Sequence, residues 1–220
     1  MTSPTPDIRA AFSVPFGFAL RPDDGLNEEL ALLFLEREQL GERHANPQPY
    51  THRNPVLFES NFDLFKDQDR RITALRDFCL EELTKLVVAL NEYDASINRR
   101  LRIGMDAWFH VTHQGGFFGV HNHPMASWSG VYCITPGDEG QTADAGGELA
   151  FINPFIMNTM FIDAGNSNQY APYSLVSRAF NLKAGELILF PSWVLHEVKP
   201  YVGRNPRITV AFNAWFHLEA

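Results

Sequence analysis

Three histidines are the residues of this chain whose spacing most clearly permits chemistry. His121 and His123 are separated by one residue, and His196 follows a long apolar run nearer the C-terminus. Alternate side chains of a strand point to the same side, so His121 and His123 can act together if they lie on a strand. Imidazole is a ligand of Zn, Cu, Fe and Ni. The three histidines therefore predict a transition-metal site.

Other candidate ligands and catalytic residues have less support from the sequence. His110 and His113 are alternative ligands, but His110 lies in a hydrophobic strand pattern and His113 in the turn that follows it. His44 and His52 lie in a proline-rich connection without a partner at ligand spacing. We also find no nucleophile elbow, since the candidate nucleophiles Ser129 and Cys133 both fall inside a strand pattern.

The elements that must position the histidines are mostly short strands. Beyond residue 100 the sequence predicts strands at 107–112, 128–134, 148–152, 187–190, 194–198 and 207–216. Turn residues separate these strands, and no helices alternate with them. This pattern favours a mainly β jelly-roll barrel, cupin-like in outline.

The first hundred residues differ in character. Apolar residues recur at helical intervals over 24–41 and again, more clearly, over 69–91, and residues 10–20 favour an early strand. We expect one domain over 1–220, in which a helical portion, residues 1–100, supports a catalytic β-core at 101–217.

Composition narrows the class of protein. The formal charge of −8 argues against nucleic acid as a partner, and no apolar run is long enough to cross a membrane. The N-terminus lacks the basic and apolar regions of a signal peptide. With two cysteines, buried thiols are the expected reading rather than a disulfide framework. We expect a cytoplasmic protein, and an apolar edge in its N-terminal half could form a homodimer.

Four stretches together carry a family resemblance: 121–124 (HNHP), 129–132 (SGVY), 185–196 (GELILFPSWVLH) and 207–213 (RITVAFN). They resemble the iron(II)/2-oxoglutarate-dependent oxygenases, most of all the bacterial and phage branch with a His-x-His…His metal motif. The resemblance covers about residues 101–217. It implies a double-stranded β-helix that presents the metal ligands.

The resemblance also implies the cofactors and their ligands. His121 and His196 match the two standard histidine ligands of Fe(II), and His123 stands where most relatives carry Asp or Glu. A third neutral imidazole leaves the metal more positive, which favours dianionic 2-oxoglutarate and would also admit Zn or Ni in the isolated protein. Dioxygen would be the co-substrate.

Arg207 and Thr209 match the residues that bind the far carboxylate of 2-oxoglutarate in this family. An Arg side chain can bind a carboxylate through two parallel hydrogen bonds, and Thr209 shares the face of Arg207 on a strand. Tyr132 could add a hydroxyl group to the same carboxylate or could serve only in packing.

The leading functional hypothesis is an oxygenase that hydroxylates a small molecule or peptide and releases succinate and CO2. We expect the substrate to be framed by the loop 136–147, the irregular segment 155–181 and Trp193. One alternative is a cupin-type metalloenzyme, either a cofactor-independent dioxygenase or an isomerase, for which Glu148 would have to reach the metal. Another is a metal-binding or sensing module without catalysis.

Overall fold

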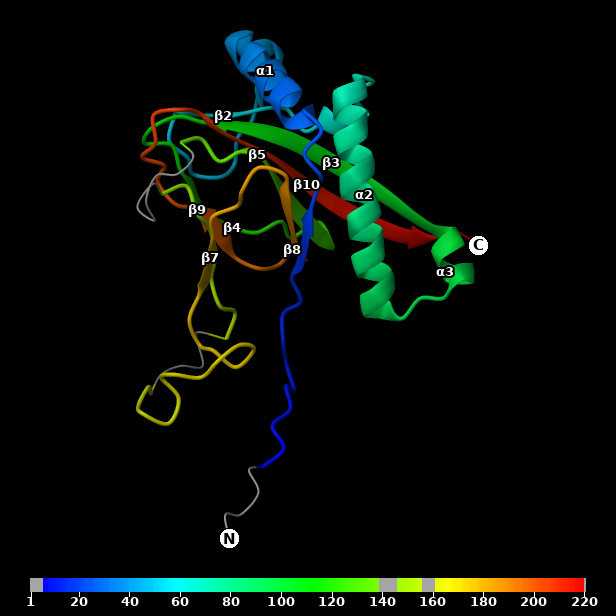
Figure 1. Ribbon diagram of the computed structural model, residues 1–220, viewed down its shortest axis with the longest axis vertical. Coiled ribbons are helices and arrows are strands. Elements are labelled where there is room, and N and C mark those ends of the chain that lie inside the picture. Colours follow the sequence, from blue (N-terminus) through cyan, green and yellow to red (C-terminus); the bar gives the residue numbers. More distant parts are fainter. Residues whose placement is uncertain (1–5, 139–145, 156–160, 220) are drawn as a thin grey trace.

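The computed structural model describes residues 6–138, 146–155 and 161–219, and these form two antiparallel sheets (Figure 1). The larger sheet has six strands in the order β1-β8-β5-β10-β3-β2, and the smaller has four in the order β4-β9-β6-β7. From β3 onwards the chain moves repeatedly from one sheet to the other, as in a jelly roll. The predicted mainly β fold is confirmed. The strands are β1 (Gly17–Leu20), β2 (Leu57–Glu59), β3 (Leu101–Thr112), β4 (Phe118–His121), β5 (Trp128–Thr135), β6 (Leu149–Phe151), β7 (Arg178–Phe180), β8 (Glu186–Pro191), β9 (His196–Val198) and β10 (Arg207–Leu218).

Strand β10 is the centre of the larger sheet. It pairs with β3 along its whole length, so that Arg207 lies opposite Thr112 and Thr209 opposite His110. On its other side it pairs with β5, where Thr209 lies opposite Cys133 after a register shift between Ile208 and Thr209. Because side chains alternate along a strand, this register brings Thr209, His110 and Cys133 to the same face of the sheet.

Two long helices cover the other face of the larger sheet (Figure 1). Helix α1 spans Leu26–Gln39 and α2 spans Arg70–Asn91, while the short helix α3 (Ala95–Arg100) leads into β3. The side chain of Asp69 accepts a hydrogen bond from the backbone of Arg71 and so caps α2. The predicted apolar stripe of α2 is buried, at Ile72, Leu75, Cys79, Leu83 and Val87.

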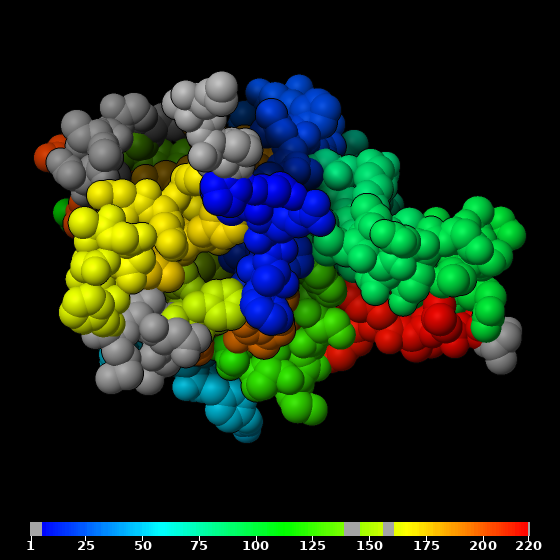
Figure 2. Space-filling view, turned by 90° about the horizontal axis from the view of Figure 1, so that it is seen from below, coloured from blue at the N-terminus to red at the C-terminus, as the bar shows by residue number. Residues whose placement is uncertain are grey.

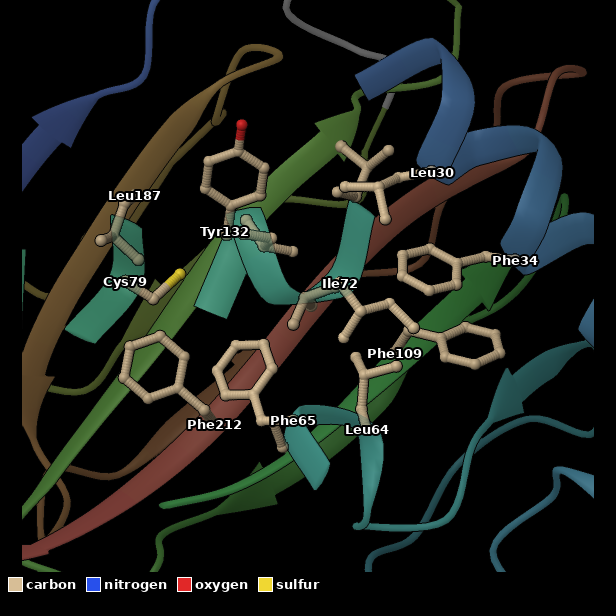
Figure 3. Close-up of a cluster of buried hydrophobic side chains, with 14 of the residues drawn as sticks. Leu30, Phe34, Leu64, Phe65, Ile72, Cys79, Phe109, Tyr132, Leu187 and Phe212 are labelled. Atoms are coloured by element: carbon tan, nitrogen blue, oxygen red, sulfur yellow. The ribbon is translucent and has the colours of Figure 1, made fainter. Parts of the chain in front are cut away.

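The strands of the larger sheet contribute to two separate cores. Figure 3 shows the helix-side core, where Phe34 of α1 stacks on Phe109 of β3 at a centroid distance of 4.4 Å. A smaller core lies between the sheets and includes Cys133, Phe151 and Phe190. Buried on both faces, these strands read as continuous apolar runs rather than alternating ones. Cys79 and Cys133 are free and buried, as expected.

The N-terminal hundred residues do more than support the barrel, because they supply two strands of the larger sheet. β1 pairs with β8 at one edge, and β2 pairs with β3 at the other. Residues 178–180, expected as part of an irregular segment, form β7. Residues 139–145 of the predicted loop and 156–160 of the predicted segment lie outside the described residues.

The segment before β1 extends away from the two sheets on the side of the loop of residues 161–177 (Figure 1), and Figure 2 shows both from below. Ile8 and Phe12 share a surface hollow with Tyr170 and Tyr173. Within the described residues, no helix combines the length and the apolar character that a membrane crossing requires.

Candidate metal centre

The three predicted ligands meet between the ends of two strands of the smaller sheet. His121 ends β4 and lies directly opposite His196, which begins β9. His123 follows in the turn after β4, where its backbone N–H donates to the carbonyl oxygen of Ser192. One nitrogen from each ring lies within 4.8 Å of the other two. The spacing allows a single ion to be shared by all three imidazoles.

Hydrogen bonds orient two of the rings. Nδ1 of His121 lies 2.7 Å from the carbonyl oxygen of Gly119, and Nδ1 of His196 lies 2.9 Å from that of Val194. A carbonyl can only accept, so Nδ1 carries the proton in both rings. Nε2 of each ring is then left as the lone-pair donor, which is the usual arrangement around a protein-bound metal.

Burial keeps all three imidazoles neutral. Burial, together with the positive charge that His121 would carry, lowers the pKa of His123 and of His196 to about 3. The pKa of His121 is lowered by burial as well. A neutral imidazole is the form that binds metal, so the site needs no proton release near neutral pH.

A cavity of about 350 Å³ adjoins the three histidines and has walls from both sheets. Arg207 and Thr209 of β10 line it and are only 6% and 2% exposed. Within residues 6–138, 146–155 and 161–219, Arg207 has no carboxylate or other hydrogen-bond acceptor as a partner, and burial lowers its pKa. A guanidinium that lines a cavity and has no ion-pair partner among these residues favours an anion in that part of the cavity.

The comparisons with known proteins agree with this geometry. Residues 106–213, which contain all three histidines and Arg207, match the family model described as "Putative 2OG-Fe(II) oxygenase". These residues belong to the 2OG-Fe(II) oxygenase family. Such oxygenases are oxidoreductases, and the predictions of family and of an enzyme are confirmed.

Solved structures of other oxygenases share the fold at low sequence identity. A prolyl-4-hydroxylase from Pseudomonas putida is 19% identical, with a TM-score of 0.56 over 94% of each chain. A prolyl hydroxylase from Trichoplax adhaerens, solved with a hypoxia inducible factor peptide, is 16% identical, with a TM-score of 0.56 over 91% of this chain and 83% of that one. HygX from Streptomyces hygroscopicus, solved with nickel, 2-oxoglutarate and hygromycin B, is 12% identical, with a TM-score of 0.55 over 92% and 83%. No curated protein matches the chain.

Tyr132 is the one residue predicted to bind metal or 2-oxoglutarate that does not line the cavity. Its ring lies in the helix-side core, and its hydroxyl group donates to Oδ1 of Asn27 at 2.8 Å (Figure 3). The cause is strand parity, since Val131 and Cys133 take the inner face of β5 and Tyr132 must take the outer one. Trp193, expected to frame the substrate, is 51% exposed and is absent from the cavity wall.

Glu148 does not join the metal ligands. The described residues hold one cluster of histidine, cysteine and carboxylate groups with metal-binding spacing, and it consists of the three histidines alone. Of the alternative ligands, His110 lies in the cavity wall but contacts Glu59, and His113 pairs with Glu38 of α1 instead. Among the described residues, the candidate metal centre therefore contains no carboxylate.

Sequence reasoning missed one wall of the cavity. It is formed by Asn46, Tyr50, Thr51, Glu59 and Phe62, together with Trp108 and His110 of β3. None of the described residues between 155 and 181 contributes to it. The spacing of Trp108 and His110 could have predicted part of this wall. The two aromatic residues, each with a ring N–H or nitrogen, share one face of a strand next to β10. No local pattern predicts that the proline-rich segment before β2 folds over them.

Proposed function

We propose that this protein is an Fe(II)- and 2-oxoglutarate-dependent dioxygenase that hydroxylates its substrate and releases succinate and CO2. One observation carries the proposal: the buried Arg207 lines the same cavity as three neutral imidazoles that converge on one point. The cavity thus combines a site for a divalent metal with a site for an anion. Succinate and CO2 account for the carbon of 2-oxoglutarate; one atom of dioxygen would enter succinate and the other the hydroxylated substrate.

The residues present fit both groups. His121, His123 and His196 would hold the metal, and Arg207 with Thr209 would bind the far carboxylate of 2-oxoglutarate. Three neutral imidazoles do not compensate the charge of a divalent ion. A bound dianion would compensate the charges of the metal and of Arg207.

When bound, Fe(II) with 2-oxoglutarate would supply the activation of dioxygen and its coupling to oxidative decarboxylation. The contribution of the chain is to orient these groups and to exclude water. Phe190 packs against His196 at a centroid distance of 4.9 Å, and Phe118 against His121 at 5.0 Å. These apolar rings cover part of the ligand cluster and lower the local polarity, which strengthens electrostatic contacts there.

Fe(II) is the metal that we propose for the active enzyme. Neutral nitrogen ligands bind Zn(II) and Ni(II) at least as readily, so the isolated protein should also accept these ions. Dioxygen chemistry requires a metal that changes oxidation state, which Zn(II) does not do. We therefore expect Zn(II) to compete with Fe(II) and to inhibit turnover.

The test is the affinity for 2-oxoglutarate. Protein loaded with Fe(II) without oxygen should bind 2-oxoglutarate, and after oxygen is admitted it should form succinate. Arg207→Gln should weaken binding by a factor of about ten or more, because it removes a charge-assisted hydrogen-bond pair, which is worth about 1.5–3 kcal/mol. The control is Arg204→Gln, three positions away in the exposed turn before β10. If iron-loaded protein has no measurable affinity for 2-oxoglutarate, the proposed function is wrong.

A further inference from the structure

A buried carboxylate lies in the wall of the same cavity and is unused by the proposed cofactors. Glu59 of β2 is only 4% exposed and lies opposite His110 in the register of β2 and β3. Its Oε1 accepts a hydrogen bond from Nδ2 of Asn46 at 2.5 Å, and its Oε2 lies 3.3 Å from Nε2 of His110. All three residues line the cavity.

The hydrogen bonds around His110 cannot all form at the same time. The indole N–H of Trp108 donates to Nε2 of His110 at 3.1 Å, and the same nitrogen faces Oε2 of Glu59. If Nε2 accepts from Trp108, it has no proton for Glu59. If Nε2 carries a proton for Glu59, the indole N–H loses its acceptor. In the first case, which satisfies Trp108, Oε2 of Glu59 is left needing a donor.

Glu59 also carries a full negative charge. Burial raises its pKa, whereas the hydrogen bond from Asn46 and the nearby charge of Arg53 lower it; where Nε2 of His110 carries a proton, the hydrogen bond from His110 lowers it too. Glu59 and Arg207 are the two cavity-lining residues, among those described, that carry a full charge at neutral pH. With Arg207 bound to 2-oxoglutarate, Glu59 is the charge that remains for a substrate.

Aromatic rings lie beside this carboxylate. Trp108 packs against Phe62 at a centroid distance of 4.5 Å, and it lies 5.7 Å from His123 on the side of the metal ligands. Tyr50 and Phe62 belong to the same wall and are 89% and 40% exposed, so they lie towards the solvent. Faces of Trp, Tyr and Phe attract cations, and a carboxylate among them strengthens that preference.

We propose that the substrate of this protein carries an ammonium group, which Glu59 binds while Trp108 and Phe62 pack against its carbon chain. The inference rests on the proposed function, because it concerns the space that 2-oxoglutarate and the metal leave in the same cavity. The ammonium group supplies the donor that Oε2 of Glu59 needs. Trp108 contacts both His110, the neighbour of Glu59, and His123 of the three histidines. The reacting carbon is therefore separated from the amine by part of the substrate.

The test compares a cation with its neutral counterpart. Phenethylamine and 2-phenylethanol differ in one terminal group, and each is titrated by calorimetry into protein loaded with Zn(II) and 2-oxoglutarate. We expect the amine to bind about ten times more tightly than the alcohol, a difference of about 1.4 kcal/mol. In Glu59→Gln the two should bind about equally. Equal binding to the wild-type protein overturns the proposal, as does a preference that persists in Glu59→Gln.

A matched control is available on the opposite side of β3. The carboxylate of Glu38 also lies next to a histidine, with Oε1 2.8 Å from Nε2 of His113, but neither residue lines the cavity. Glu38→Gln removes the same charge and should keep the preference for the amine. The control separates a local contact of Glu59 from a general loss of negative charge.

A second measurement needs no change at Glu59. In protein with labelled tryptophan, the indole N–H signal of Trp108, assigned with Trp108→Phe, should shift on addition of phenethylamine and stay in place with 2-phenylethanol. An unchanged signal at saturating amine places the amine elsewhere and overturns the proposal. The affinity for 2-oxoglutarate is measured on the same samples. If wild-type protein binds no 2-oxoglutarate but still prefers the amine, the proposed function fails and the assignment of Glu59 does not.

Discussion

Lowering the pH should destabilise the metal-free protein, chiefly through two of the metal ligands. The pKa values of His123 and His196 lie near 3 in the folded state and at 6.5 in the unfolded chain. The unfolded chain therefore binds more protons whenever the pH is below 6.5. The contribution of these histidines to stability is complete above that pH and is lost as the pH falls towards 3.

The size of the effect follows from the two pKa values. At pH 5 each histidine lowers the free energy of unfolding by about 2 kcal/mol relative to neutral pH, and the pair by up to about 4 kcal/mol. Domains are commonly stable by about 5–15 kcal/mol, so this loss is large. Carboxylates contribute little in this window, since Asp24 and Asp69, with pKa values of about 2, titrate at lower pH.

Urea unfolding of chelator-treated protein at pH 7 and pH 5 measures the effect. His196→Gln should remove about half of the difference between the two pH values, because one of the two titrating groups is gone. The exposed His217 provides the control, and His217→Gln should leave the difference intact. Equal stability of the wild-type protein at the two pH values would refute the assignment of buried, neutral imidazoles.

Three further predictions concern single contacts. Thr209→Val should weaken 2-oxoglutarate binding about fivefold, measured by calorimetry, because one hydrogen bond worth about 1 kcal/mol is lost. Unchanged affinity would show that Thr209 does not bind 2-oxoglutarate. Tyr132→Phe should lower the free energy of unfolding by about 1 kcal/mol through its bond to Asn27 and leave 2-oxoglutarate affinity unaltered; a loss of affinity would mean that Tyr132 reaches the cavity after all. Chelation should remove one metal ion per chain, with metal content measured by mass spectrometry, and His121→Ala should reproduce the loss; a variant that retains its metal would contradict the three-histidine assignment.

The parts of the site that the sequence predicts are those set by local periodicity. His121 and His123 share a side because they are two apart, and Arg207 and Thr209 do so for the same reason. Their meeting with His196 was expected because a jelly roll brings such strand ends together. Helix α2 was equally readable, since its apolar residues recur at helical spacing and Asp69 precedes them.

The parts that the sequence does not reveal depend on pairing between distant segments. Glu59 becomes a cavity residue only because β2 pairs with β3, and three residues flanked by prolines and turns give little sign of a strand. For a related reason, the sequence does not predict which face of β5 carries Tyr132. Both faces of β5 are buried, so the pattern of apolar residues does not say which face is the inner one.

The division of the site between the two sheets also bears on how the protein is held together. Two of the metal ligands, His121 and His196, belong to the smaller sheet, whereas Arg207 and Thr209 belong to the larger. A metal ion with bound 2-oxoglutarate would therefore link the smaller sheet to the larger one. At one hundred times its dissociation constant a ligand adds about 2.7 kcal/mol to the free energy of unfolding. Binding of these cofactors would thus also hold the two sheets together, and the stability of the fold would rise with cofactor supply.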